Sequence, residues 1–196
     1  MVTALDNRTA LILIDLQQGI VSRPVAHPRE QVLGNVARLI AAFRQYNLPV
    51  VVVTVDPAGA VGRKPPRVQL SFTRPTSGEG TPADFLALAP ELVTRPDDIF
   101  ITKHTWSAFH KTPLHDQLQS LGITGIVLAG ISTSIGVEGT ARSASERGYN
   151  LTFPSDAMTD LVPLAHENSI ERIFPRLGEI GTTDEVIALL PNRTCP

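Results

Sequence analysis

The chain has 196 residues, of which 42% are hydrophobic and 18% are charged. This balance is typical of a globular protein and excludes a disordered chain. The formal net charge is −2, with no long run of Lys or Arg, which argues against nucleic acid as a partner and leaves a small molecule as the expected ligand.

The first part of the chain predicts a strand, a helix and a second strand. Residues 10–14 form a continuous apolar run before Asp15, as in a strand buried on both faces. Apolar residues recur at helical spacing over 29–46, and a β-branched run follows at 50–55. Residues 56–82 are rich in Pro, Gly, Ser and Arg, so we expect a long loop that could serve as a lid.

The rest of the chain continues the alternation of helices and strands. We expect helices over about 83–92, 113–121, 134–147, 164–177 and 183–190, and strands over 99–102, 125–129 and 150–153. The repeated order predicts an α/β fold of three layers, with a mostly parallel β-sheet flanked by helices on both faces, in a single domain spanning 1–196.

The sequence shows no signal-peptide pattern and contains one cysteine. The N-terminus lacks the features of a signal peptide, and no run reaches the roughly 18 apolar residues of a membrane span, so we expect a cytoplasmic protein without a membrane partner. The one cysteine, Cys195, lies next to the C-terminus, which excludes an internal disulfide and argues against a catalytic thiol there.

Charged and small residues gather where the predicted strands end. Ligands of open parallel sheets bind beyond the carboxyl ends of the strands. Asp15, Asp56 and Lys103 stand at such ends, as does the segment 130–136. A turn or solvation explains any one of these charges, but opposite charges at one sheet edge favour an active site.

The segment 130–136 combines small and hydroxyl residues immediately before a helix. Its backbone N–H groups can surround an anion or a developing oxyanion. The segment could also be an ordinary turn with Thr133 or Ser134 as the helix N-cap, and this interpretation is compatible with anion binding. No glycine-rich dinucleotide or P-loop pattern follows the first strand, so we expect no nucleotide cofactor.

Histidine spacing gives no metal signature. The five histidines lack His-Glu-x-x-His spacing, and neither Asp-x-His nor His-x-His follows a strand, so we expect no metal and a structural or surface role for each. They are His27, His104, His110, His115 and His166.

Three motifs together resemble the isochorismatase-like hydrolases, a family that includes isochorismatases, nicotinamidases and N-carbamoylsarcosine amidohydrolases. They are residues 10–17 (ALILIDLQ), residues 103–114 (KHTWSAFHKTPL), and residues 130–149 followed by Asp156 and Ala157. The resemblance runs from about residue 9 to 190. It implies a homo-oligomer, a dimer or larger, and a non-proline cis peptide at Ile131-Ser132.

The resemblance also implies site residues. Cysteine-dependent members use an Asp and a Lys equivalent to Asp15 and Lys103, together with a nucleophilic Cys where this chain has Gly136. Glycine supplies no thiolate, so amidase chemistry of the nicotinamidase type is disfavoured. The metal ligands that those enzymes carry after the second strand are also missing, because the chain reads Val55-Asp56-Pro57-Ala58 there.

Isochorismatases proper resemble the chain in having a small residue in place of the nucleophilic cysteine. They cleave a vinyl ether without a covalent intermediate. By this resemblance Asp15 is the general acid and Lys103 orients polar groups. An adjacent ammonium lowers the pKa of a carboxyl group and burial raises it, so a protonated Asp15 requires that desolvation dominates. Further substrate contacts are expected from Gln17, Asp56, Trp106, Ser132, Thr133 and Ile135.

Asp56 distinguishes the chain from the isochorismatases that it otherwise resembles, because those enzymes have a neutral glutamine at the equivalent position. A carboxylate would repel a dicarboxylate such as isochorismate unless basic residues of the following loop compensate; these are Arg63, Lys64, Arg67 and Arg74. Two hypotheses follow. One is a cofactor-free hydrolase of a small polar, possibly vinyl-ether, substrate. The alternative is a catalytically impaired binding or assembly protein, which the retained pair Asp15 and Lys103 disfavours.

Overall fold

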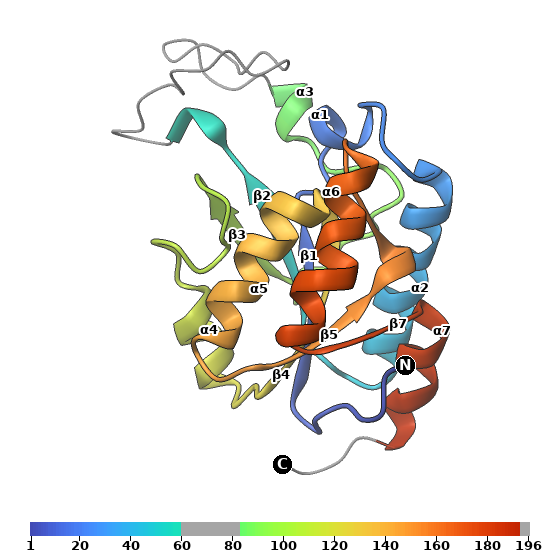
Figure 1. The fold of residues 1–196 in the computed structure, drawn as a ribbon. Coiled ribbons are helices and arrows are strands. Elements are labelled where there is room, and N and C mark those ends of the chain that lie inside the picture. Colours follow the sequence, from blue (N-terminus) through green and yellow to red (C-terminus); the bar gives the residue numbers. More distant parts are fainter. Residues whose placement is uncertain (60–82, 193–196) are drawn as a thin grey trace.

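The computed structural model describes residues 1–59 and 83–192 and contains a parallel sheet with helices on both faces (Figure 1). The strands follow the order β3-β2-β1-β4-β5-β7, with β6 beside β4, and every pairing is parallel. Their bounds are β1 Thr9–Ile14, β2 Val50–Val55, β3 Ile99–Lys103, β4 Gly125–Ile131, β5 Asn150–Pro154, β6 Met158–Thr159 and β7 Glu179–Gly181. The predicted fold class is confirmed.

The helices are short apart from α2. The α-helices are α1 Gln18–Val21, α2 Arg29–Gln45, α3 Ala83–Leu86, α4 Leu114–Ser120, α5 Glu138–Ser145, α6 Pro163–Asn168 and α7 Thr183–Leu189. Single π-turns form η2 Thr133–Val137 and η4 Ser169–Ile173, and 3₁₀ turns form η1 Pro57–Gly59, η3 Ser155–Ala157, η5 Phe174–Arg176 and η6 Leu190–Asn192. Among the described residues no helix is both long and apolar enough to cross a membrane.

Alternation along β1 divides the core into two layers. Leu11 and Leu13 pack into a cluster with the apolar face of α2. Ile12 and Ile14 point the other way, into a cluster that includes Leu118 of α4. All six residues of β1 are buried, because helices cover both faces of a parallel sheet. The continuous apolar run of residues 10–14 therefore reflects burial of the strand on both faces, as predicted.

The helix expected over 83–92 is wrong beyond Leu86. There the chain leaves the helix and pairs with the segment after β1: Ala89 N donates to the Leu16 carbonyl at 2.9 Å, and Leu88 forms an antiparallel bridge with Gln17. Pro90 would also interrupt a helix, because proline lacks the N–H that the helical hydrogen bond needs. Pairing to the strand end thus replaces the second helical turn.

The single helix expected over 164–177 is also wrong. The segment is divided into α6, the π-turn η4 and the 3₁₀ turn η5. Pro175 lies in the last of these turns, where a continuing α-helix would lack a donor. Two strands were not predicted, β6 and β7, since two or three residues are too few to show a period.

The order of the strands reverses at the centre of the sheet. From β1 the chain proceeds to β2 and β3 on one side, and β4 then returns to pair with β1 on the other side. The carboxyl ends of β1 and β4 therefore flank the point where the direction of winding reverses, which is where open α/β sheets bind ligands.

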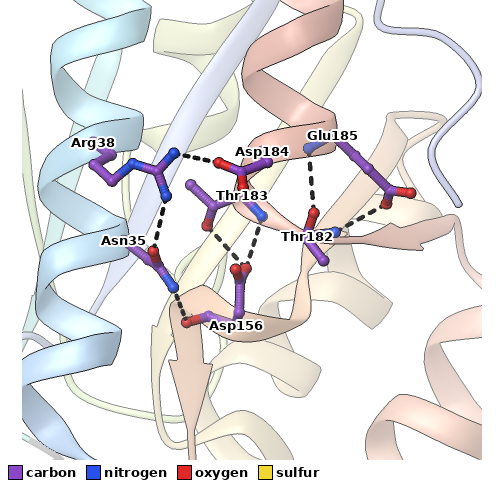
Figure 2. A network of polar contacts seen from close by, with 7 residues as sticks. All are labelled: Asn35, Arg38, Asp156, Thr182, Thr183, Asp184 and Glu185. Atoms are coloured by element: carbon purple, nitrogen blue, oxygen red, sulfur yellow. Dashed lines mark hydrogen bonds and ion pairs between the residues drawn. The ribbon is translucent and has the colours of Figure 1, made fainter.

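Asp156, one of the motif residues, anchors a helix on the face of the sheet covered by α2. Its Oδ1 accepts hydrogen bonds from the backbone N–H of Thr183 at 2.7 Å and from the Thr183 hydroxyl at 2.9 Å (Figure 2). Asn35 of α2 donates to the Asp156 carbonyl at 2.9 Å. An unpaired N–H group at the start of α7 is thereby satisfied. Asp156 thus ties η3 to α2 and α7.

Candidate active site

Two buried side chains of opposite charge meet at the carboxyl edge of the sheet. Asp15 follows β1 and Lys103 ends β3, and Lys103 Nζ donates to Asp15 Oδ2 at 2.7 Å. Asp15 is 5% exposed and Lys103 is 2% exposed. The prediction that these two side chains lie within hydrogen-bonding distance is confirmed. The Lys103 ammonium also donates to the Thr105 carbonyl at 3.1 Å.

The backbone at the end of β1 aims the Asp15 carboxyl group. Asp15 N donates to the Val53 carbonyl at 2.9 Å, and its φ of 54° lies in the left-handed region, which aspartate tolerates better than most residues. Gly130 of β4, with φ 127°, lies beside Ile14; a Cβ there would come within 2.2 Å of the Ile14 carbonyl oxygen. Glycine at 130 thus permits the close approach of β1 and β4 next to the site.

Burial controls the charge of Asp15. Desolvation raises the pKa of this carboxyl group to about 6, although the charge and the hydrogen bond of Lys103 lower it. Its second oxygen, Oδ1, is buried and has no hydrogen-bond partner among the described residues. The effect of desolvation on the pKa of Asp15 thus outweighs that of the Lys103 ammonium, which is the condition stated above for a protonated Asp15. Near pH 6 Asp15 can therefore hold or release a proton.

Gly136 lies next to this pair, in the π-turn after β4. A Cβ on Gly136 would lie 3.0 Å from Asp15 Oδ2 and 3.6 Å from Lys103 Nζ. It would also lie 2.8 Å from the Cγ2 methyl of Ile14, which branches from the Cβ of a fully buried residue and must shift to admit a side chain at 136. Gly136 is not among the glycines with positive φ, so its backbone conformation is open to other residues.

The loop between β4 and η2 has the predicted cis peptide. The Ile131-Ser132 bond is cis, and the Ser132 carbonyl accepts hydrogen bonds from Ile135 N at 3.2 Å and Val137 N at 3.1 Å. The expected cap by Thr133 or Ser134 is wrong, because Ser132 holds the N-cap position without a side-chain hydrogen bond. Instead, the carboxylate of Asp160 accepts hydrogen bonds at the start of η2. Its Oδ2 accepts from both the N–H and the hydroxyl of Ser134, each at 2.8 Å.

The side chain of Thr133 contacts His166. Thr133 is fully buried, and its hydroxyl is hydrogen-bonded to His166 Nδ1 at 2.8 Å. Sequence reasoning gave His166 only a structural or surface role and did not single out Asp160. Asp160 follows β6, a strand of two residues that the sequence did not predict, and His166 lies in α6, so their contact with this loop appears only when β6 and α6 fold beside β4.

Gln17 and Asp56 lie near the pair but are engaged with the backbone. Gln17 is fully buried, and its amide group donates to the Val55 carbonyl at 3.2 Å and accepts from Val55 N at 2.7 Å. Asp56 follows β2, and its Oδ1 accepts from Ala58 N at 3.0 Å. The two contacts of Gln17 hold the segment after β1 to the end of β2. Substrate contact by either residue stays a prediction.

Trp106 and Ile135 are more accessible. Trp106 is 52% exposed and packs near Gly139 at the start of α5, while Ile135 is half-buried in η2. Their expected contact with substrate stays a prediction. Further expectations lie outside the described residues: the lid over most of 56–82, the four basic residues Arg63, Lys64, Arg67 and Arg74, and Cys195.

Potential metal ligands do not cluster in the described part of the chain. Across residues 1–59 and 83–192, no group of three or more His, Cys, Asp or Glu side chains is arranged to hold a metal ion. Asp15 has a lysine, not a second carboxylate or an imidazole, as its hydrogen-bond partner. This donor set favours proton transfer over metal binding.

The Isochorismatase domain model matches residues 9–185, which include Asp15, Lys103 and Gly136. The chain belongs to the isochorismatase family. This family member is 41% identical to the uncharacterized isochorismatase family protein YwoC of Bacillus subtilis, over 92% of this chain and 93% of that protein. It is 37% identical to the isochorismatase family protein YecD of Escherichia coli O157:H7, over 93% and 96% of the two chains.

A solved structure supports the same assignment. An isochorismatase family protein from Burkholderia thailandensis matches with a TM-score of 0.87 and 39% identity, over 98% of this chain and 100% of the other. The parallel sheet and the surrounding helices of this isochorismatase-family protein are therefore those of the family.

Proposed function

We propose that the protein is a hydrolase that cleaves a small polar vinyl ether by non-covalent acid catalysis. Asp15 is the proton donor and Lys103 orients the polar groups of the substrate. The observation that supports this most is the buried Asp15–Lys103 pair, in which desolvation raises the pKa of Asp15 to about 6. A carboxyl group with that pKa is partly protonated near neutral pH, as a general acid must be.

The reaction begins with transfer of the Asp15 proton to the terminal methylene carbon of the C=C bond. The π electrons form the new C–H bond, the methylene becomes a methyl group, and the ether carbon becomes an oxocarbenium ion. Water adds to that carbon and loses a proton, which restores the carboxyl group of Asp15. The resulting hemiketal collapses to a ketone and an alcohol, so the net change is addition of one water.

Lys103 stabilises the charge changes of this cycle. When Asp15 gives up its proton, the carboxylate that forms already has an ammonium at 2.7 Å. The gain in electrostatic attraction is therefore largest in the state that follows proton transfer. Gly136 lies beside Asp15 Oδ2 and offers no side-chain nucleophile. Its lack of a side chain favours a non-covalent route.

Turnover of a defined panel in D₂O tests the proposal. The panel contains isochorismate, chorismate, simple alkyl vinyl ethers, nicotinamide, N-carbamoylsarcosine and carboxylic esters, followed by NMR. We expect hydrolysis of at least one vinyl ether, with one deuterium in the new methyl group, and a loss of about 10²–10⁴-fold in Asp15→Asn. Asp97→Asn, an exposed carboxylate, is the matched control.

Three outcomes contradict the proposal. Hydrolysis of amides or esters with no vinyl ether cleaved would point to acyl chemistry. Vinyl-ether cleavage that is unaffected by Asp15→Asn would remove Asp15 from the role of acid. Tight binding of panel members without any turnover would instead support a binding protein.

A further inference from the structure

A pair of histidines outside the proposed site borders a surface cavity between α2, η3, α6 and η4. The cavity is lined by His27, Gln31, Asp156, Met158, His166 and Glu171, among others. The imidazole rings of His27 and His166 are tilted, with centroids 4.5 Å apart. His27 is exposed, whereas His166 is 7% exposed. The proposed reaction uses neither residue.

His166 contacts the loop that carries Gly136. Its Nδ1 is hydrogen-bonded to the hydroxyl of Thr133 at 2.8 Å, and Thr133 is fully buried. Thr133 is the residue after Ser132 and lies less than one turn before Gly136. Any change in the hydrogen-bonding capacity of His166 therefore acts on the backbone beside the Asp15–Lys103 pair.

His27 holds the other side of the same loop. Its Nδ1 is hydrogen-bonded to the hydroxyl of Thr159 at 3.0 Å, and its backbone N–H donates to that hydroxyl at 3.2 Å. Thr159 of β6 is paired with Ile131 of β4. His166 thus binds Thr133, which follows Ser132, and His27 binds Thr159, the sheet partner of the residue before Ser132.

We propose that His166 is a positioning residue for the loop Ser132–Gly136, and that protonation of His166 shifts this loop. The proposal rests on the proposed function only in taking the loop to border the reacting groups. A proton would reach His166 from the cavity, and the change would pass to the site through Thr133.

The chemistry of imidazole gives the direction of this effect. A neutral ring can accept a hydrogen bond at Nδ1, but a protonated ring only donates, so a Thr133 hydroxyl that donates to Nδ1 must turn. Burial lowers the pKa of His166, the charge of His27 lowers it further, and Asp160 raises it. The other charged groups that line the cavity are Asp156, Glu167 and Glu171. The neutral form is thus the one that fits the loop at neutral pH.

An NMR titration in an Asp15→Asn background tests the proposal without any substrate. This background removes the titration of Asp15, which would also perturb the loop. We expect the backbone amide signals of residues 132–136 to shift with pH at the same midpoint as the His166 imidazole. His27→Asn removes one group that lowers the pKa of His166, so both midpoints should rise together. This variant keeps His166 and its bond to Thr133.

His166→Asn separates positioning from protonation. An asparagine amide can take the place of Nδ1 and bond Thr133, but it does not titrate. We expect its loop signals at pH 8 to resemble those of the parent and to lose their midpoint. His110→Asn, at an exposed histidine, is the control that should change neither. Loop signals that still titrate in His166→Asn, or that stay fixed when His27→Asn moves the His166 midpoint, would overturn the proposal.

Discussion

Gly136 lies so close to Asp15 that a Cβ added to it would be 3.0 Å from Asp15 Oδ2. The same Cβ would be 3.6 Å from Lys103 Nζ. A side chain at position 136 would therefore reach both members of the charged pair. The backbone conformation of Gly136 permits a side chain, but the tightest contact, 2.8 Å to the Cγ2 methyl of buried Ile14, requires that side chain to shift.

Gly136→Cys should create a reactive thiol. The Lys103 ammonium lowers the pKa of a nearby thiol, and near pH 6 the opposing carboxylate of Asp15 is about half protonated. We expect iodoacetamide at pH 6 to modify Cys at 136 several-fold faster than Cys195 in the same folded protein. Lys103→Met in that variant should abolish the difference. Equal rates at the two positions, with the fold intact, would show that the electrostatics of the site are misjudged.

Vinyl-ether hydrolysis should decline as pH rises. The active form of Asp15 is protonated, and its pKa is about 6, so about one-tenth of the protein is in that form at pH 7. We expect kcat/KM to be level below about pH 6 and to fall about tenfold per pH unit above it. A pH–rate profile of the free enzyme checks this. A rate that instead increases through pH 6 would make Asp15 a base.

Lys103→Met should raise the pKa of Asp15 above its value of about 6. The lysine lowers this pKa through its charge and its hydrogen bond, and methionine keeps a similar volume without either. A ¹³C titration of labelled aspartate carboxyl groups measures the change. Lys111→Met, at an exposed lysine, is the control. An unchanged midpoint for Asp15 would mean that burial alone sets the pKa.

Asp156→Ala should destabilise the protein without touching the chemistry. The substitution removes two hydrogen bonds to Thr183 at the start of α7, and a lost cap of this kind costs about 1–2 kcal/mol. Urea unfolding measures the loss, with exposed Asp97→Ala as the comparison. If Asp156→Ala left stability intact but impaired turnover, Asp156 would belong to the site and not to the helix anchor.

The sequence predicted those parts of the fold that carry a long signal. β1 and α2 follow from a continuous apolar run and from helical spacing, and both lie within a residue of the expected bounds. The helix expected over 83–92 ended early, because pairing of Ala89 with Leu16 is a contact between distant segments. Local propensity contains no information about such a contact.

The same division applies to the site. Asp15 and Lys103 could be placed together because both stand at ends of parallel strands, which meet at one edge. His166 and Asp160 could not, since they reach the loop after β4 only through β6, a strand of two residues that shows no period. The pKa of Asp15 was also undecided by sequence, because it depends on how completely the folded chain removes water.

The position of β1 between β2 and β4 has a consequence for synthesis on the ribosome. Thr9 of β1 is paired with Gly125 of β4, so one edge of a fully buried, mostly apolar strand stays open until more than a hundred further residues have been translated. At about 5–20 residues per second this takes roughly 6 to 25 seconds. Open apolar edges recruit other strands. Nascent chains that end before Ile131 are therefore the species most in need of chaperone protection, and Asp15 and the loop after β4 can come together only after synthesis has passed Gly136.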